Sequence, residues 1–164
     1  MKKYEFTGET KRVELWNRTA TLHRIKATVE FGFVKVGELG GWIEKEENLS
    51  HEGKAWVCGD AEVCGDAKVW GNAKVCGDAN VCGDAEVFLA SHVLVMGSVG
   101  SRNDFTTFFR DKDNEITVKC GCFLGKIDKF LEKVTQTHGN NKYALVYRAA
   151  VEVAKLQIEL TERK

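Results

Sequence analysis

The chain contains no proline, and it has no run of 18 apolar residues. Without such a run no membrane-spanning helix is expected, and without proline no expected helix or strand is interrupted. The start, Met1-Lys2-Lys3, leads into polar, strand-like sequence rather than into the apolar core of a signal peptide. We therefore expect a soluble protein of the cytoplasm with no membrane partner.

The chain also lacks a net charge, because 24 basic residues balance 24 acidic ones. Residues 55–99 are acidic, with 2 basic and 6 acidic side chains, and residues 100–164 carry 12 basic and 9 acidic ones. The resulting +3 of the last segment is far below the basic footprint that polymeric nucleic acid demands. DNA and RNA are therefore not expected as partners, whereas a small anion is compatible with the last segment.

No known catalytic signature is present: there is no nucleophile elbow, no Walker loop and no zinc-protease motif. We expect no cofactor and no metal site. The sequence therefore gives catalysis no direct support.

What the chain does have is a repeat of six residues, Ala-x-Val-x-Gly followed by Asp or Asn, over residues 55–88. The valines of the repeat are Val57, Val63, Val69, Val75, Val81 and Val87, and an alanine lies two residues before each. A period of six is a multiple of the strand period of two and not of the helical period of 3.6. The repeat unit is therefore expected to be a short strand followed by a corner.

The corners fit this expectation, because glycine and Asx residues tolerate left-handed backbone angles best. Three units make one coil of 18 residues, and such coils stack as parallel strands. We predict a mainly β protein with C-terminal helices, built on a short left-handed parallel β-helix. The valine column runs on to Val93 and Val99, so we assign residues 55–99 to this β-helix, with at most eight strand units.

The flanking segments are expected to cap the repeat. Residues 1–54 read as an N-terminal β cap of a few short strands, with an irregular first coil over residues 36–54. Residues 100–164 read as a β-hairpin (104–110 and 115–123) and two helices, the first starting at Ile127 and ending near Gly139, the second running from about Asn141 to Thr161. The second helix is apolar on more than one face, which indicates that it is sandwiched against a neighbouring element or subunit.

Four of the six cysteines are placed by the repeat, so that Cys58 lies under Cys76 and Cys64 under Cys82. We expect reduced thiols, because neighbouring parallel strands hold Cβ atoms at about 4.8 Å, which is longer than a disulfide prefers. These positions follow the inward valines and should form an apolar outer wall, buried by trimerisation or by the C-terminal helices. Metal binding by these cysteines, or a cation on the stacked aspartates, is the alternative.

One polar cluster is the loop over residues 100–104, where the repeat gives way to the hairpin. The backbone amides of this loop and the guanidinium of Arg102 are suited to bind phosphate oxygens. The phenylalanines that follow could stack on a nucleotide base. A second cluster, residues 138–143, lies at the joint between the helices, where free amides would hold an anion. An ordinary turn explains each cluster equally well. The candidate ligand-binding residues are Ser101, Arg102, Asn103, Thr107, Phe109, Arg110, His138, Asn140, Asn141, Lys142 and Arg148.

The stretch LGGWIEKEENLS (39–50), followed by the repeat, resembles the first coil of bacterial and phage hexapeptide-repeat proteins, some of them acyltransferase-like. The stretches GSRNDFTTFFR (100–110), CGCF (120–123) and HGNNKYALVY (138–147) together resemble a C-terminal module of small phage proteins. This module is similar to that of the phage Thoeris anti-defence sponges. The resemblance implies an oligomer that sequesters a cyclic ADP-ribose-type immune signal without cleaving it, in the cytoplasm of an infected bacterium. The acidic repeat departs from what an anion binder needs.

The sequence thus predicts a non-catalytic homo-oligomer, a trimer or a multiple of a dimer, that binds a small phosphorylated nucleotide of the cyclic ADP-ribose or cyclic oligonucleotide class. One alternative is a hexapeptide-repeat acyltransferase, which would use a histidine as its base. Its candidates are His23, His51, His92 and His138, but no loop is inserted between coils to build a cleft. The other alternative is a purely structural, self-assembling protein.

Overall fold

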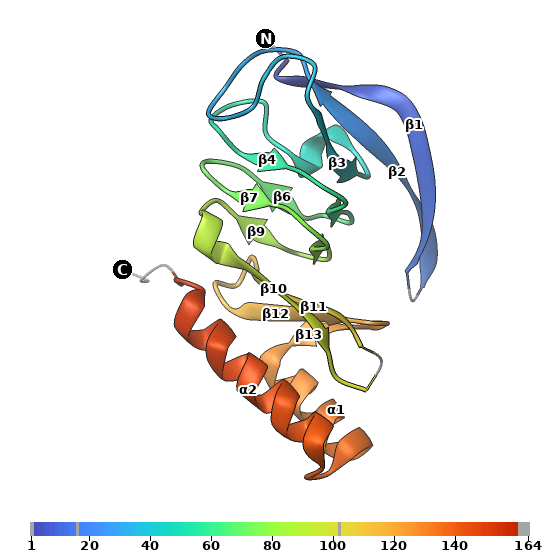
Figure 1. The fold of residues 1–164 in the computed structure, drawn as a ribbon, viewed down its shortest axis with the longest axis vertical. Coiled ribbons are helices and arrows are strands. Elements are labelled where there is room, and N and C mark those ends of the chain that lie inside the picture. Colours follow the sequence, from blue (N-terminus) through green and yellow to red (C-terminus); the bar gives the residue numbers. More distant parts are fainter. Residues whose placement is uncertain (1, 16, 102, 161–164) are drawn as a thin grey trace.

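The computed structural model describes residues 2–15, 17–101 and 103–160. The protein is mainly β, with two helices at its C-terminal end (Figure 1). The expected class, mainly β with C-terminal helices, is therefore confirmed. Three parts follow one another along the molecule, namely an N-terminal hairpin, the repeat, and a C-terminal sheet covered by the helices.

The N-terminal part is one long antiparallel hairpin rather than a few short strands. It consists of β1 (Tyr4–Leu15) and β2 (Arg18–Ala27). β2 pairs antiparallel with β3 (Leu39–Ile43), which in turn runs parallel to the repeat strand β5 (Glu62–Val63). The hairpin extends along the side of the repeat (Figure 1). Its residues Ala20 and Leu22 are buried beside the outward cysteines of the repeat, whereas Tyr4, Ile25 and Ala27 belong to the main core.

The repeat forms two-residue strands that pair in parallel with the unit 18 residues further on. The six strands are β4 (Trp56–Val57), β5 (Glu62–Val63), β6 (Lys68–Val69), β7 (Lys74–Val75), β8 (Asn80–Val81) and β9 (Glu86–Val87). The pairs are β4 with β7, β5 with β8, and β6 with β9. The 18-residue stacking predicted from the period of six is therefore confirmed.

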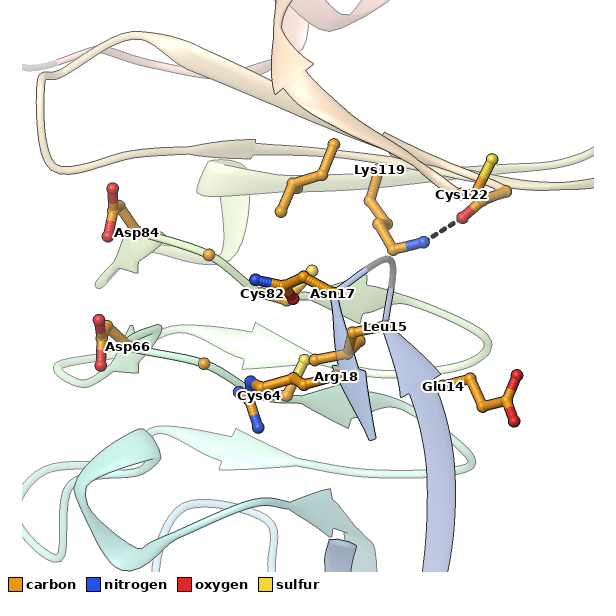
Figure 2. Close-up of a pocket in the computed structure, with 14 residues that line it drawn as sticks. Glu14, Leu15, Asn17, Arg18, Cys64, Asp66, Cys82, Asp84, Lys119 and Cys122 are labelled. Atoms are coloured by element: carbon orange, nitrogen blue, oxygen red, sulfur yellow. Dashed lines mark hydrogen bonds between the residues drawn. The ribbon is translucent and has the colours of Figure 1, made fainter. Parts of the chain in front are cut away.

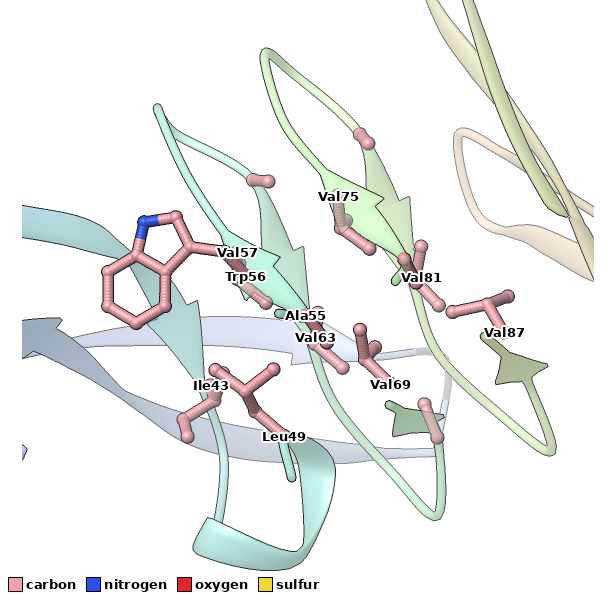
Figure 3. Close-up of a cluster of buried hydrophobic side chains, with 14 of the residues drawn as sticks. Ile43, Leu49, Ala55, Trp56, Val57, Val63, Val69, Val75, Val81 and Val87 are labelled. Carbon is pink, nitrogen blue, oxygen red and sulfur yellow. The ribbon is translucent and has the colours of Figure 1, made fainter. Parts of the chain in front are cut away.

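The repeated valines and alanines point inward and form the main core (Figure 3). All six valines of the repeat are at most 1% exposed. The corners need glycine, because Gly59 has a φ of +61° and a Cβ there would lie 3.1 Å from the backbone nitrogen of Gly77 in the next layer. The hexapeptide pattern thus encodes both the core and the tight approach of the corners.

The C-terminal part is an antiparallel sheet in the order β10 (Val93–Val99), β11 (Asp104–Arg110), β12 (Ile116–Cys120) and β13 (Phe123–Lys126). The helices α1 (Ile127–His138) and α2 (Lys142–Gln157) follow. Neighbouring residues of β11 point to opposite faces. Phe108 therefore packs among the helices, and Phe109 packs against the repeat core. The expected hairpin between 104–110 and the strand after it, and both helices, are confirmed. The strand expected over 115–123 was too long, because the chain turns at Gly121-Cys122 and returns as β13, and the second helix ends at Gln157, before the expected Thr161.

The valine column does not continue as repeat beyond β9. A short 3₁₀ helix (Ala90–His92) follows, and residues 93–99 form β10, which pairs antiparallel with β11. The reason is that the Gly-Asx corner is missing after Asp84, since the next unit ends in Phe88-Leu89. Without a corner the chain leaves the stack, so the expectation of repeat units at Val93 and Val99 was wrong.

The cysteine expectations also need correction. Cys58 and Cys76 form a disulfide, with their Cα atoms 4.6 Å apart, inside the range that disulfides accept. The expectation of free thiols holds for Cβ atoms within paired strands, but Cys58 and Cys76 lie just after the strands, at the start of the corner, where the side chains can tilt toward each other. Because the bond closes a loop of about one coil, it is expected to stabilise the fold by about 3 kcal/mol.

The second stacked pair, Cys64 and Cys82, remains as two buried thiols. A hydrogen bond to Cys82 and burial both raise the pKa of the Cys64 thiol. The pair packs against Ala20, Leu22 and Trp42, and thus mainly against the N-terminal hairpin and β3. The outer wall on this side is therefore covered by the chain's own N-terminal part, and not by the C-terminal helices or another subunit.

Candidate functional site

A pocket of about 180 Å³ lies in the C-terminal part, and we call it the C-terminal pocket. Three separate stretches of the chain meet there. Its lining residues are Ser101, Asp104, Cys120, Gly121, Cys122, Phe123, Phe130, Lys133, Val134, Thr137, His138 and Tyr147. The loop after β10, the turn between β12 and β13, and the two helices each contribute. Residues of the two predicted polar clusters, namely Ser101 and Asp104 of the first and His138 of the second, thus line one pocket of the chain.

Tyr147 forms the floor of this pocket. It lies on the buried face of α2, where its ring meets Phe130 edge-on at 5.6 Å and is stacked on the His138 ring at 5.9 Å. Burial and the neighbouring Cys120 raise the pKa of Tyr147. Its hydroxyl therefore stays protonated at neutral pH and acts as a hydrogen-bonding group near Ser101 and Cys120.

The loop that carries the first polar cluster is fitted to this tyrosine. Gly100 has a φ of +79°, and a Cβ at this position would overlap the Tyr147 hydroxyl. Asn103 also has a positive φ, of 47°, and its N–H donates to the carbonyl of Gly100 at 3.3 Å. Ser101 lines the pocket, whereas Arg102 lies outside the described residues. Glycine at position 100 therefore allows the loop to close over α2.

The rim of the pocket carries one cation, Lys133 of α1, among the residues that the structure describes there. Lys133 and its neighbour Thr137 are exposed, one helical turn apart on the same face. Asp104 adds a carboxylate on the opposite segment. The pocket thus combines aromatic walls with a rim that has a cation, hydroxyl groups and an acid.

Most of the second polar cluster holds the joint between the helices. The Arg148 guanidinium donates to the Gly139 carbonyl at 2.8 Å and to the Asn140 side chain at 3.1 Å. The Asn141 side chain caps α2 by accepting from the Ala144 N–H at 3.1 Å. These three predicted residues therefore have structural roles, as in the capped-turn interpretation. Lys142 is exposed beside Tyr143, and of this cluster only His138 lines the pocket.

Three further predicted residues join the C-terminal sheet to the repeat. The Thr107 hydroxyl accepts from the Asn80 N–H at 3.0 Å, and the Phe109 side chain is completely buried. Arg110 donates to the Glu86 carbonyl at 2.7 Å and lies over the Phe88 ring. These contacts stabilise the junction and do not bring the three side chains to the C-terminal pocket.

A larger pocket, of about 620 Å³, lies between the tip of the N-terminal hairpin, the repeat corners and the turn after β12 (Figure 2). Three of its five charged side chains are already in ion pairs, and a fourth, Lys119, donates a hydrogen bond to the Gly121 carbonyl. Arg18 donates two hydrogen bonds to Glu44, at 2.6 and 2.9 Å, and Asp66 and Asp84 pair with lysines. None of the predicted site residues lines it. An anion would find few unpaired donors there.

A third pocket, of about 300 Å³, is dominated by acidic side chains of the repeat. Asp60, Glu62 and Asp78 line it, together with Lys11 and Lys119. The acidic charge that the sequence shows for residues 55–99 is therefore concentrated at a surface pocket. Such a pocket does not favour a phosphorylated ligand.

The histidines offer little to an acyltransferase mechanism. His92 is fully buried and its Nδ1 accepts from the N–H groups of Phe88 and Leu89 at 3.1 and 3.2 Å. His51 accepts from the Lys3 N–H and stacks on Tyr4, and His23 stacks on Phe6. Only His138 faces one of the pockets described above.

Sequence reasoning missed several lining residues, chiefly Cys120, Cys122, Lys133 and Tyr147. A signal for three of them was present, because the CGCF stretch and the HGNNKYALVY stretch contain them. No signal pointed to Lys133, which lies on a helix face that the sequence shows only as polar. Its place at the rim depends on how α1 packs on the sheet.

Comparison with protein-family models and with curated proteins gives no match for this chain. Across the ranges described here, no three or more His, Cys, Asp or Glu side chains are grouped so as to hold a metal ion. In those same ranges no helix is both long and apolar enough to span a bilayer. The chemistry of the pockets therefore carries the functional argument.

Proposed function

We propose that the protein is a non-catalytic binding protein that holds a small phosphorylated nucleotide, of the cyclic ADP-ribose or cyclic oligonucleotide class, at the C-terminal pocket. One observation carries the proposal. The three stretches 100–104, 120–123 and 138–147, which are separated in sequence, line the same pocket. A purely structural turn would not require them to meet around a cavity.

The lining fits the two chemical parts of a nucleotide. The rings of Tyr147, His138 and Phe123 offer faces and edges against which a base would stack. The Lys133 ammonium and the Ser101 hydroxyl offer donors for phosphate oxygens. An apolar or a cationic ligand would leave these donors unused.

The pocket is smaller than the roughly 300 Å³ from which sites for whole drug-sized ligands begin. At about 180 Å³ it would hold one part of a nucleotide. The rest of the ligand would extend past the exposed side chains of Lys133 and Thr137. We therefore place a base or a phosphate group in the pocket and the remainder of the ligand at its rim.

Binding without chemistry is favoured by the state of the polar groups at the floor. The raised pKa of Tyr147 makes its hydroxyl a poor base at neutral pH. The Cys120 thiol accepts a hydrogen bond from the Thr106 hydroxyl at 3.3 Å and lies beside the tyrosine. In a phage-infected bacterium, a protein of this kind would sequester an immune signal and so counteract the defence.

We further propose that the three parallel ladders of the repeat form a short left-handed β-helix, and that the protein acts as a homo-oligomer, a trimer or a multiple of a dimer. The 18-residue pairing and the inward valines support the β-helix. An experimentally determined structure in which successive coils wind to the right would contradict it.

Calorimetric titration with cyclic ADP-ribose and ADP-ribose tests the function. Wild type is expected to bind at least one of them, and Lys133→Ala is expected to bind it at least tenfold more weakly, which is about 1.4 kcal/mol. Lys129→Ala is the matched control, because Lys129 lies one turn earlier on α1, pairs with Glu132 and does not line the pocket. Equal losses in both variants, or no effect of Lys133→Ala, would contradict the assignment of the pocket.

A further inference from the structure

The repeat carries two pairs of stacked cysteines, and the two pairs occupy equivalent positions. Each of the four cysteines directly follows an inward valine, and the strands before them, β4 with β7 and β5 with β8, pair valine against valine. In both pairs the N–H of the first cysteine donates to a valine carbonyl one coil further on, at 2.8 and 3.0 Å. The backbone therefore holds Cys64 against Cys82 in the way that it holds Cys58 against Cys76, which form a disulfide.

The two pairs differ in what covers them. Cys58 and Cys76 are half-buried, whereas Cys64 and Cys82 are only 1% and 3% exposed, under the N-terminal hairpin and β3. Cys64 and Cys82 nevertheless line the pocket of about 620 Å³ beside the hairpin tip, and Figure 2 shows them there on neighbouring coils. We call this cavity the thiol pocket. A reagent that reaches the covered pair must therefore come through the thiol pocket.

The two covered thiols interact directly. The Cys64 thiol donates a hydrogen bond to the Cys82 sulfur, which raises the pKa of Cys64 and is the main reason that the pKa of Cys82 is lowered. The Lys119 ammonium, which also lines the thiol pocket, lowers the pKa of Cys82 further, against the opposing effect of burial. Because thiolates and not thiols attack disulfides, Cys82 is the nucleophile of the pair and Cys64 is the thiol that reacts second.

From this register and this access we propose that Cys64 and Cys82 form a second, reversible disulfide of the repeat, by exchange with a small disulfide of the glutathione type in the thiol pocket. The volume of the thiol pocket lies within the range of about 300–1,000 Å³ that sites for small ligands occupy. Cys122 lines the same pocket, but it lies outside the repeat, in the turn before β13. The stacked pair, and not Cys122, is therefore the site of the bond.

The exchange needs no reagent besides the small disulfide. The Cys82 thiolate attacks one sulfur of glutathione disulfide, so that a mixed disulfide forms and one glutathione thiolate leaves. Cys64 then loses its proton and attacks the Cys82 sulfur, which releases the second glutathione thiolate. Two cysteine thiols are thereby oxidised by two electrons, glutathione disulfide is reduced to two glutathione thiols, and the two cysteine protons end on them. Neither cysteine lines the C-terminal pocket, so the inference does not depend on the ligand of that pocket.

Peptide mapping of the full-length protein tests the second disulfide. The protein is incubated with glutathione disulfide, free thiols are blocked in denaturant, and the chain is cleaved on the N-terminal side of aspartate. The aspartates that separate the four repeat cysteines are Asp60, Asp66, Asp78 and Asp84. Cys64 is then carried by the peptide 60–65 and Cys82 by the peptide 78–83. Mass spectrometry is expected to show these two peptides linked after glutathione disulfide, and separate after dithiothreitol.

Two single variants test the order of attack. Cys64→Ser is expected to stop at the mixed disulfide, with glutathione on Cys82, whereas Cys82→Ser is expected to gain glutathione on Cys64 at least tenfold more slowly. Cys122→Ser is the matched control, because it removes a thiol of the same pocket outside the repeat, and it is expected to form the linked peptides at the wild-type rate. Peptides that stay separate with glutathione disulfide, a bond from either cysteine to Cys122, or equal rates in the two variants would overturn the proposal.

Discussion

Three buried polar side chains show how this small fold tolerates polar groups inside. Asn48 is fully buried, and its amide donates to the Gly65 and Ala67 carbonyls at 3.1 and 2.9 Å. The buried Asp111 accepts from the Thr117 hydroxyl at 2.6 Å and from two backbone N–H groups of its own turn. The third is His92. The Asn48 and Asp111 side chains are thus bonded, as burial requires, because an unpaired polar group would cost about 1–3 kcal/mol. In His92 only Nδ1 is bonded, whereas the buried Nε2 has no hydrogen-bond partner among the described residues.

His92 makes stability depend on pH. Burial and then the nearby charge of Arg110 lower the pKa of His92, so the unfolded chain takes up the proton at a higher pH than the folded chain. Stability is therefore present above the ordinary histidine pKa of about 6.5 and is lost as the pH falls below it. Protonation would also remove the acceptor that the Phe88 and Leu89 N–H groups use.

We expect the free energy of unfolding to fall between pH 7.5 and pH 5.5, and to fall less in His92→Asn. The asparagine oxygen can accept the same two N–H groups but does not titrate. Urea unfolding at the two pH values measures both slopes. Burial also lowers the pKa of His51, which adds to the pH dependence of both proteins. The contribution of His92 is therefore the difference between the pH slopes of wild type and variant. Equal slopes would show that His92 does not contribute.

At the residue scale, sequence reasoning found the right stretches but assigned several side chains wrongly. Arg110 and Arg148 were expected to face a phosphate, yet both donate to backbone carbonyls that hold the fold. A guanidinium has the same donors for either partner. Whether a guanidinium binds a backbone carbonyl or a phosphate depends on which backbone carbonyls are unpaired near it in the fold. The local sequence does not contain that information.

Among the elements, the loop after β10 and the helix α2 are the pair that forms the pocket. Their contact depends on Gly100, because any Cβ there would overlap the Tyr147 hydroxyl. The loop therefore cannot keep its position over α2 with another residue at this point. The pocket's shape and the loop's conformation are coupled.

Gly100→Ala is expected to destabilise the protein by about 2–4 kcal/mol, the sum of the strain at positive φ and the clash with Tyr147. The same variant is expected to lose affinity in the nucleotide titration. Gly77→Ala is the matched control, because Gly77 has a φ of +68° with nothing within 4 Å of an added Cβ. It is expected to cost about 1 kcal/mol and to bind normally. Similar values for both variants in chemical denaturation would contradict the packing of the loop on α2.

Periodic elements and the pairing within the repeat could be predicted from the sequence, whereas contacts between the other segments could not. The period of six predicted pairing 18 residues apart, and the 3.6-residue period predicted α1 and α2, since both patterns are local consequences of which side chains must be buried. The position of β10 against β11, and of the N-terminal hairpin over Cys64 and Cys82, depends on contacts distant in sequence. No periodicity records such contacts.

Over the whole molecule, the repeat separates two different surroundings. Its side that faces the N-terminal hairpin carries the two larger pockets, which are lined by acidic residues of the repeat and also by Lys119 and Gly121 of the C-terminal part. Its C-terminal end is closed by the sheet, whose far face carries the helices and the C-terminal pocket. The repeat therefore supports the binding module without itself contributing to the pocket, and the charge difference between the segments follows this division.

The most direct test of the central claim is recovery of the ligand after binding. Cyclic ADP-ribose is mixed with the full-length protein, unbound ligand is removed by gel filtration, the protein is denatured by heat, and the released nucleotide is identified by mass spectrometry. We expect the released nucleotide to be intact cyclic ADP-ribose, with much less of it from Lys133→Ala than from Lys129→Ala. Release of a chemically altered nucleotide would show an enzyme, and the absence of any retained nucleotide would show that the pocket does not bind this class. Either result would contradict the account.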